Sequence, residues 1–168
     1  MLEAGDVIDS FTGQYEFLSN FYYSPIKVHK VGRGKTVEHV YQAMKCQDKD
    51  QAAYVLSLPT PGQAKRAGRK VILREDWEMV KVHAMYKCLR AKFPGPGDEL
   101  SERLLATDWI NLIEGNTWGD QVWGVCGGQG ANLLGKILMH RRAELVVMTS
   151  MLDAACPSNM SRNWEPLW

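Results

Sequence analysis

A long helical pattern across residues 75–92 constrains the fold of this chain more than any other feature. Its apolar positions recur at the spacing of one helix face, and the pattern ends where two prolines interrupt the chain. The apolar positions are Val80, Ala84, Met85, Cys88 and Leu89, and the prolines are Pro94 and Pro96. The pattern predicts a helix whose apolar face packs against other elements.

Shorter patterns predict the remaining elements. Residues 11–31 are aromatic and β-prone, which indicates short strands and a hairpin that ends at residues 32–34. Thr36 and Thr60 are typical helix N-caps, and Pro61 suits the first helical position. We predict helices at about 37–47, from 50 to before Pro59, from residue 61 onward, at 98–106 and at 132–152, and a short strand at 109–113. This order indicates an α+β fold: a mostly helical single domain with a small antiparallel sheet.

Composition narrows the class of protein. The chain has 168 residues, 45% of them hydrophobic, and a formal net charge of +1, which argues against disorder and against nonspecific coating of DNA. We expect one domain over residues 1–155 and a poorly ordered tail over residues 156–168. The four cysteines are widely spaced, the chain start does not resemble a signal peptide, and no run of about 18 apolar residues occurs. We therefore expect a soluble cytoplasmic protein.

The helix predicted at 37–47 has a row of polar residues next to its apolar face. Val37, Val40, Tyr41 and Met44 form an apolar stripe, and Glu38, Gln42 and Lys45 form a polar stripe beside it. On the pattern alone this is typical of a surface helix with solvated polar residues. The alternative is that a carboxylate, an amide and an amine line one wall of a cleft. The adjacent His39 has no second ligand cluster, so a metal site is not indicated.

Residues 114–124 combine glycines with two tryptophans and fit neither a helix nor a strand. Trp118 and Trp123 either fill the core under a long loop or provide an aromatic wall for a planar base. Asp120, between them, is a candidate for proton transfer. Residues 130–136 imitate a phosphate-loop motif, but Ile137 replaces the required Ser or Thr, so a P-loop NTPase is excluded. The basic run at 65–70 is either a solvated face or a pyrophosphate contact.

Several of these segments together resemble the NADAR superfamily, which includes the YbiA-like proteins. The resemblance rests on residues 17–22, on Thr36-Val37-Glu38-His39 through Gln42 to Lys45, and on Asp76-Trp77 with later positions of that helix. Residues 115–120, Trp123-Gly124, residues 130–135 and 138–139 complete the pattern in the same order. An ordered set of motifs over about residues 11–145 is more specific than any single motif. It favours the cleft-wall interpretation of the helix at 37–47.

The resemblance implies N-glycosidase chemistry with no cofactor and no metal. Its known branches cleave early phosphorylated riboflavin-pathway intermediates or remove ADP-ribose from modified guanine, and both cut at C1 of a ribose that carries phosphate. The positions of this sequence that it implies to be catalytic are Glu38, Lys45 and Asp120. Those it implies to bind substrate are Asn20, Phe21, His39, Gln42, Trp77, Asn116, Trp118, Trp123 and Asn132.

The implied residues have suitable chemistry, and two mechanisms stay open. Cleavage of a glycosidic C–N bond develops positive charge at C1, which a carboxylate of Glu38 or Asp120 would stabilise while the other activates water or protonates the leaving nitrogen. Alternatively, the amine of Lys45, with a lowered pKa, attacks the open-chain C1 aldehyde and forms a Schiff base. Gln42 and Asn116 would hold ribose hydroxyls while a tryptophan stacks on the base.

Two other functional classes compete with this one. A noncatalytic module would bind ADP-ribose or NAD in the same pocket, but such a module has no need for both Glu38 and Lys45. A nucleic-acid-binding protein would use the exposed aromatics to stack bases, and the near-neutral charge weakens that interpretation. The expected partner is a small ribose-phosphate or ADP-ribose substrate, or ADP-ribosylated nucleic acid, without a membrane.

Overall fold

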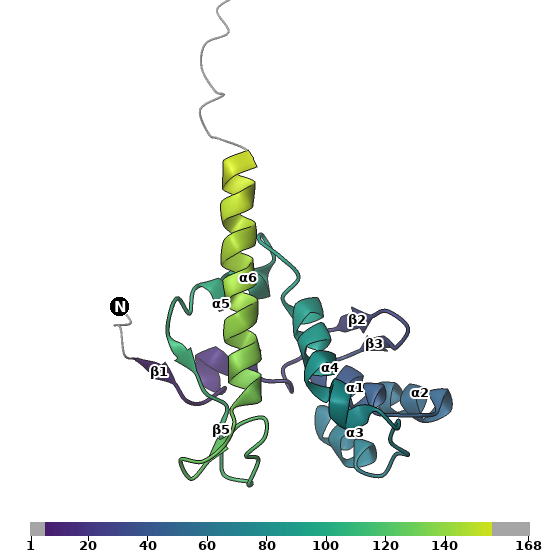
Figure 1. Cartoon of the computed structure of the whole chain (residues 1–168). Helices are drawn as coiled ribbons and strands as arrows, with labels where there is room; N and C mark the ends of the chain where they lie inside the picture. Colours follow the sequence, from purple (N-terminus) through teal and green to yellow (C-terminus); the bar gives the residue numbers. More distant parts are fainter. Residues whose placement is uncertain (1–5, 156–168) are drawn as a thin grey trace, which may run out of the picture.

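The computed structural model describes residues 6–155 as one α+β domain (Figure 1). The helices are η1 (Gly13–Leu18, a 3-10 helix), α1 (Val37–Met44), α2 (Lys49–Ser57), α3 (Pro61–Gly68), α4 (Trp77–Lys92), α5 (Glu99–Leu105) and α6 (Leu133–Ala155). The strands are β1 (Val7–Ile8), β2 (Ile26–Val28), β3 (Gly32–Gly34), β4 (Asn111–Leu112), β5 (Gly115–Asn116) and β6 (Val125–Cys126). The predicted tail at 156–168 lies outside the described residues.

Local capping signals define where the helices begin. Thr36 caps α1, and its side chain accepts the backbone N–H of His39. Thr60 and Gln63 form a reciprocal capping box at the start of α3, with Pro61 in the first turn. The predicted helix starts at residues 37 and 61 are therefore confirmed.

The segment at 11–31 differs from the prediction. Only β2 and β3 form the expected hairpin, whereas residues 13–18 form η1. Gly13 has a φ of 56°, which breaks an extended chain. Phe17 and Leu18 are neighbours in the sequence and both are buried. A strand would place them on opposite faces, so a helical turn is the conformation that buries both.

The strands form three separate two-stranded pairs. β2 and β3 pair antiparallel, as expected, but β1 pairs parallel with β4 and β5 pairs parallel with β6. The parallel pairs are two residues long and join segments that a hairpin turn cannot connect. The first pair ties the N-terminal segment to β4, and the second closes the loop at residues 117–124.

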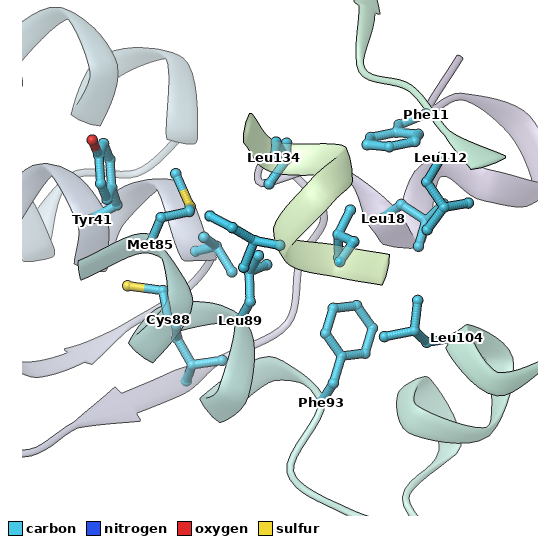
Figure 2. Packing of buried hydrophobic residues seen from close by; sticks show 14 of the residues in the cluster. Phe11, Leu18, Tyr41, Met85, Cys88, Leu89, Phe93, Leu104, Leu112 and Leu134 are labelled. Carbon is cyan, nitrogen blue, oxygen red and sulfur yellow. The ribbon is translucent and has the colours of Figure 1, made fainter. Parts of the chain in front are cut away.

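Helix α4 lies between α1 and α6 and carries the centre of the core. Figure 2 shows this core running from Tyr41 past Met85 and Leu89 to Phe93 and Leu112. Each fully buried Leu or Phe contributes about 1.5–3 kcal/mol of hydrophobic free energy. In Figure 1 the α1–α3 group and the β2–β3 hairpin lie on one side of α4, and α5 and α6 lie on the other. The continuous core joins these two halves into one body.

Two further observations concern the expected free thiols and the expected absence of a membrane span. Cys46, Cys88 and Cys126 are free thiols in the described part of the chain. Across residues 6–155, no helix combines the length and the apolar character that a membrane span requires. The cytoplasmic location stays a prediction.

Candidate active site

Contacts from outside the helix brace the first turn of α1. The backbone N–H of Glu38 donates to the Asn20 carbonyl oxygen over 3.0 Å. His39 Nδ1 lies 2.8 Å from Thr36 Oγ1, and its Nε2 lies 3.1 Å from the Leu58 carbonyl oxygen. Burial lowers the pKa of His39, which favours the neutral ring. Because both ring nitrogens have protein partners, His39 holds α1 in place at this position.

Glu38 is a buried carboxyl whose orientation is set by Gln42. The two residues are 5% and 4% exposed, and Gln42 Nε2 donates to Glu38 Oε1 over 2.7 Å. Burial raises the pKa of Glu38, while the Gln42 hydrogen bond and the cations of Lys65 and Lys45 oppose the rise. The interpretation of α1 as a solvated surface helix is wrong, because α2, α3 and α4 cover it.

Lys45 follows Glu38 along the same polar stripe and lies beside two aromatic rings. Its Nζ is 5.7 Å from the centroid of the Tyr41 ring and 5.9 Å from that of Trp77. Burial lowers the pKa of Lys45, Glu38 opposes the shift, and the cations of Lys65 and Arg69 add to it. A lowered pKa increases the fraction of neutral amine, the form that attacks an electrophilic carbon.

Three aromatic rings from three parts of the chain form a wall next to these groups. The Tyr41 ring is 5.2 Å from Trp77 in a tilted arrangement and 5.4 Å from Trp123 in an edge-on arrangement, measured between centroids. Such contacts favour defined ring orientations. They connect α1, the start of α4 and the loop between β5 and β6. Tyr41, expected only as a core residue, is thus the link between two of the three predicted tryptophans, Trp77 and Trp123.

Asp120 and Asn116 shape the loop that carries Trp123. Asp120 Oδ1 accepts the backbone N–H groups of Val122 and Trp123 over 3.1 and 2.9 Å. Asn116 Nδ2 donates to the carbonyl oxygens of Asp120 and Val125, and its Oδ1 accepts the Asp120 N–H. Both polar atoms of the Asn116 side chain, Nδ2 and Oδ1, therefore form hydrogen bonds within the loop. Asp120 lies close enough to Glu38 to raise the pKa of that carboxyl.

Lys65 of α3 lies between two exposed aromatic side chains. Its Nζ is 5.6 Å from the centroid of Phe21 and 5.8 Å from the centroid of Trp118. The exposed fractions of these rings are 41% and 62%. Lys65 also stabilises the ionised form of Glu38. The basic run at 65–70 therefore contributes at least one cation to the site, and the two rings flank this cation.

Glu114 is a carboxyl of the site that sequence reasoning did not select. Burial raises the pKa of Glu114 to about 7; Asp120 adds to the rise, and Lys65 and Lys92 oppose it. Its Oε2 is buried without a hydrogen-bond partner, as are Asn20 Oδ1 and Gln42 Oε1. A single glutamate beside a strand is uninformative in a sequence. The only signal for Glu114 was its position at the start of the segment at 114–124.

The structure brings together most of the predicted site residues. Those that meet around α1 and α3 are Glu38, Gln42, Lys45, Asp120, Asn20, Phe21, Trp77, Trp118 and Trp123. Asn132 instead supports the backbone: its Oδ1 accepts the Glu114 N–H over 3.0 Å and its Nδ2 donates to the Leu112 carbonyl over 2.9 Å. Within residues 6–155, no cluster of three or more His, Cys, Asp or Glu side chains is arranged to hold a metal ion.

Comparison with known proteins identifies the class. Residues 9–146 match the model of the NADAR domain. The chain therefore belongs to the NADAR domain family, as the ordered motifs predicted.

The named relatives narrow the activity within that family. The chain is 40% identical over 144 residues to the N-glycosidase YbiA of Escherichia coli, covering 82% of this chain and 86% of that protein. The NMR structure of E. coli YbiA superposes with a TM-score of 0.78 at 36% identity, over 89% of this chain and 90% of that one. A chloroplastic riboflavin biosynthesis protein of Zea mays is 34% identical, over 66% of this chain and 20% of its own length. The enzyme class is thus that of an N-glycosidase with a small-molecule substrate.

Proposed function

We propose that this protein hydrolyses the C1–N bond between a phosphorylated ribose and a planar base or amine. The observation that carries the proposal is the electrostatic interaction between the buried carboxyl of Glu38 in α1 and the amine of Lys45 at the C-cap of that helix. Burial raises the pKa of the carboxyl and lowers that of the amine. The pKa of each group is thereby shifted toward neutral pH. A group with such a pKa can both bind and release a proton, which acid–base and nucleophilic catalysis require.

The surroundings of this pair suit the two ends of such a substrate. Lys65 of α3 and Arg69, the C-cap residue of that helix, lie one turn apart, and both interact electrostatically with Lys45. The ion pairs found among residues 6–155 involve neither Lys65 nor Arg69. These two cations are therefore available to a phosphate group. The exposed rings of Phe21 and Trp118 supply flat apolar faces for the base.

Two routes lead from these groups to the same products. In the first, the carboxylate of Glu38 stabilises the positive charge that develops at C1 while a water molecule adds its oxygen there. In the second, the neutral amine of Lys45 displaces the nitrogen at C1 and loses a proton. The C1–O bond of the ribose ring then breaks, the ring oxygen takes up a proton, and water hydrolyses the resulting Schiff base. In both, the C–N bond electrons leave with the nitrogen, which takes up a proton, and C1 ends with the water oxygen.

The name of the maize relative favours a phosphorylated riboflavin-pathway intermediate as substrate, and ADP-ribosylated guanine is the second candidate. The decisive experiment follows release of ribose phosphate or ADP-ribose from both by wild type, Glu38→Gln and Lys45→Ala. Exposed Glu75→Gln is the matched control. We expect one substrate to be cleaved, both site variants to lose at least about 100-fold in kcat/KM, and the control to match wild type.

The same samples distinguish the two routes. Borohydride added during turnover reduces a Schiff base to a stable amine, so a mass increase on Lys45 would establish the covalent route. Wild-type turnover without any adduct would favour direct attack of water. Cleavage that both Glu38→Gln and Lys45→Ala retain in folded protein would refute the proposal. Tight ADP-ribose binding without cleavage would support a binding module instead.

A further inference from the structure

We propose that Glu114 is the acid that protonates the leaving nitrogen, and that Asn132 and Gly124 hold it in position. This inference rests on the proposed function, because only a C–N cleavage reaction requires such a donor. Neither expected mechanism assigned a role to Glu114. Its place beside β5 puts it on the same side of the domain as the Trp118–Trp123 loop.

The backbone of Glu114 is clamped on both sides. Its N–H donates to Asn132 Oδ1 over 3.0 Å, and its carbonyl oxygen accepts the Val125 N–H over 2.8 Å. A methyl group on Gly124 would lie 2.1 Å from that carbonyl oxygen and 3.0 Å from Glu114 Cγ. Gly124 therefore packs directly against the side-chain stem. These contacts fix the backbone and the Cγ atom of Glu114, which restricts the positions its carboxyl can take for proton transfer.

The charged neighbours of Glu114 place it within the candidate site. Asp120 and Lys65 interact electrostatically with Glu114, and the same two residues interact with Glu38. Lys92 is the third charged group near Glu114; its Nζ donates to the Ser19 carbonyl over 2.7 Å, in the segment that leads to Asn20 and Phe21. The geometric link to the site is Gly124, which packs against Glu114 and directly follows Trp123, whose ring contacts Tyr41 of α1.

The two glutamates differ in what surrounds their oxygens. Glu38 Oε1 accepts a hydrogen bond from Gln42, which stabilises an ionised carboxyl. Glu114 Oε2 is buried and accepts none, so an ionised Glu114 would leave a buried oxygen uncompensated. The nearby Asp120 also opposes a second negative charge. Glu114 is therefore suited to carry its proton into the reaction and Glu38 to act at C1, which is the division of roles expected when two carboxyls have different environments.

Proton movement is simple in this scheme. The O–H bond of the Glu114 carboxyl breaks as the N–H bond of the leaving base forms, and the carboxylate that remains is offset by Lys65 and Lys92. The attacking water later supplies a proton that restores the acid. No redox partner or further reactant is involved.

The closing experiment compares wild type, Glu114→Gln and the control Glu75→Gln on two kinds of N-riboside phosphate. One carries an amine or a neutral base, which must be protonated to leave; the other carries a pyridinium ring, which leaves as neutral pyridine. We expect Glu114→Gln to lose about 10²–10⁴-fold in kcat/KM on the first substrate and less than about 3-fold on the second. The decline in wild-type kcat/KM as pH rises through about 7 should also disappear in the variant.

Turnover of the amine substrate by Glu114→Gln within 3-fold of wild type would overturn the inference while leaving the proposed function intact. An equal loss on both substrates, or an unchanged pH profile, would assign Glu114 a structural role as counter-ion of Lys92. Absence of any wild-type turnover would refute the proposed function and this role together. Independently of turnover, carboxyl ¹³C NMR with Glu114→Gln for assignment should show titration near pH 7; titration below pH 5 would overturn the inference.

Discussion

The side-chain amide of Gln42 donates to Glu38 Oε1 over 2.7 Å, and helix α3 holds the amide there. A methyl group on Gly68 would lie 1.9 Å from Gln42 Oε1 and 2.7 Å from its Cδ. The orientation of the buried carboxyl therefore depends on a glycine of the neighbouring helix α3, through Gln42. This dependence makes Gly68 a sensitive test of the site.

Gly68→Ala should displace the Gln42 amide from Glu38. We expect kcat/KM to fall about 10-fold or more and the free energy of unfolding to fall by about 1–3 kcal/mol, because the added methyl overpacks the contact. Gly62→Ala is the matched control on the same helix, since its methyl would meet only Arg66 Nη1 at 3.8 Å. Steady-state kinetics and urea unfolding measure both quantities. Wild-type turnover in Gly68→Ala would show that Gln42 does not orient Glu38.

Trp118→Ala should weaken substrate binding without affecting the fold. The ring is 62% exposed, so little core packing is lost, whereas loss of stacking on a base costs about 1–3 kcal/mol. We expect KM to rise about 10-fold with the melting temperature nearly unchanged. Trp109→Ala, with a 78% exposed ring, serves as control and should leave KM at the wild-type value. Equal KM values in the two variants would remove Trp118 from the binding surface.

Lys92 should make stability rise with pH above neutrality. Burial lowers its pKa to about 7, against about 10.4 in an unfolded chain. Between these values the unfolded state binds more protons than the folded state, so the free energy of unfolding increases with pH, by at most about 1.4 kcal/mol per unit. Below about pH 7 the full cost of the buried ammonium is present. Glu114 titrates mainly below this window.

Urea unfolding at pH 7, 8 and 9 measures this effect. The unfolding free energy of wild type minus that of Lys92→Met should increase with pH, because only wild type is stabilised by deprotonation of Lys92. Lys87→Met, at an exposed position of the same helix, should show a constant difference. A constant difference for Lys92→Met as well would mean that the ammonium keeps an ordinary pKa in the folded protein.

Helix boundaries and the enzyme family were accessible from the sequence because their signals are local. Thr60 and Pro61 cap and start α3 whatever surrounds them, and the prolines after residue 93 end α4. The motif order from residue 17 to residue 139 predicted the NADAR family, which the family match confirmed. The hairpin of β2 and β3 was likewise predicted, but η1 was not, because strand propensity in an aromatic segment depends on a partner strand that the tertiary fold does not supply.

Only the tertiary structure determined which polar side chains are buried. The stripe of Glu38, Gln42 and Lys45 is typical of a solvated face until α3 covers α1. Glu114 and Lys65 are ordinary charged residues in the sequence. In the fold, however, Lys65 interacts with Glu38, and Glu114 interacts with Lys65 and Lys92, each across more than twenty residues of chain. Residue type and spacing along the chain determined the helices, the caps and the family. Desolvation and charge proximity depend on distances in space between segments that are remote in sequence, so the pKa shifts of the site exist only in the folded domain.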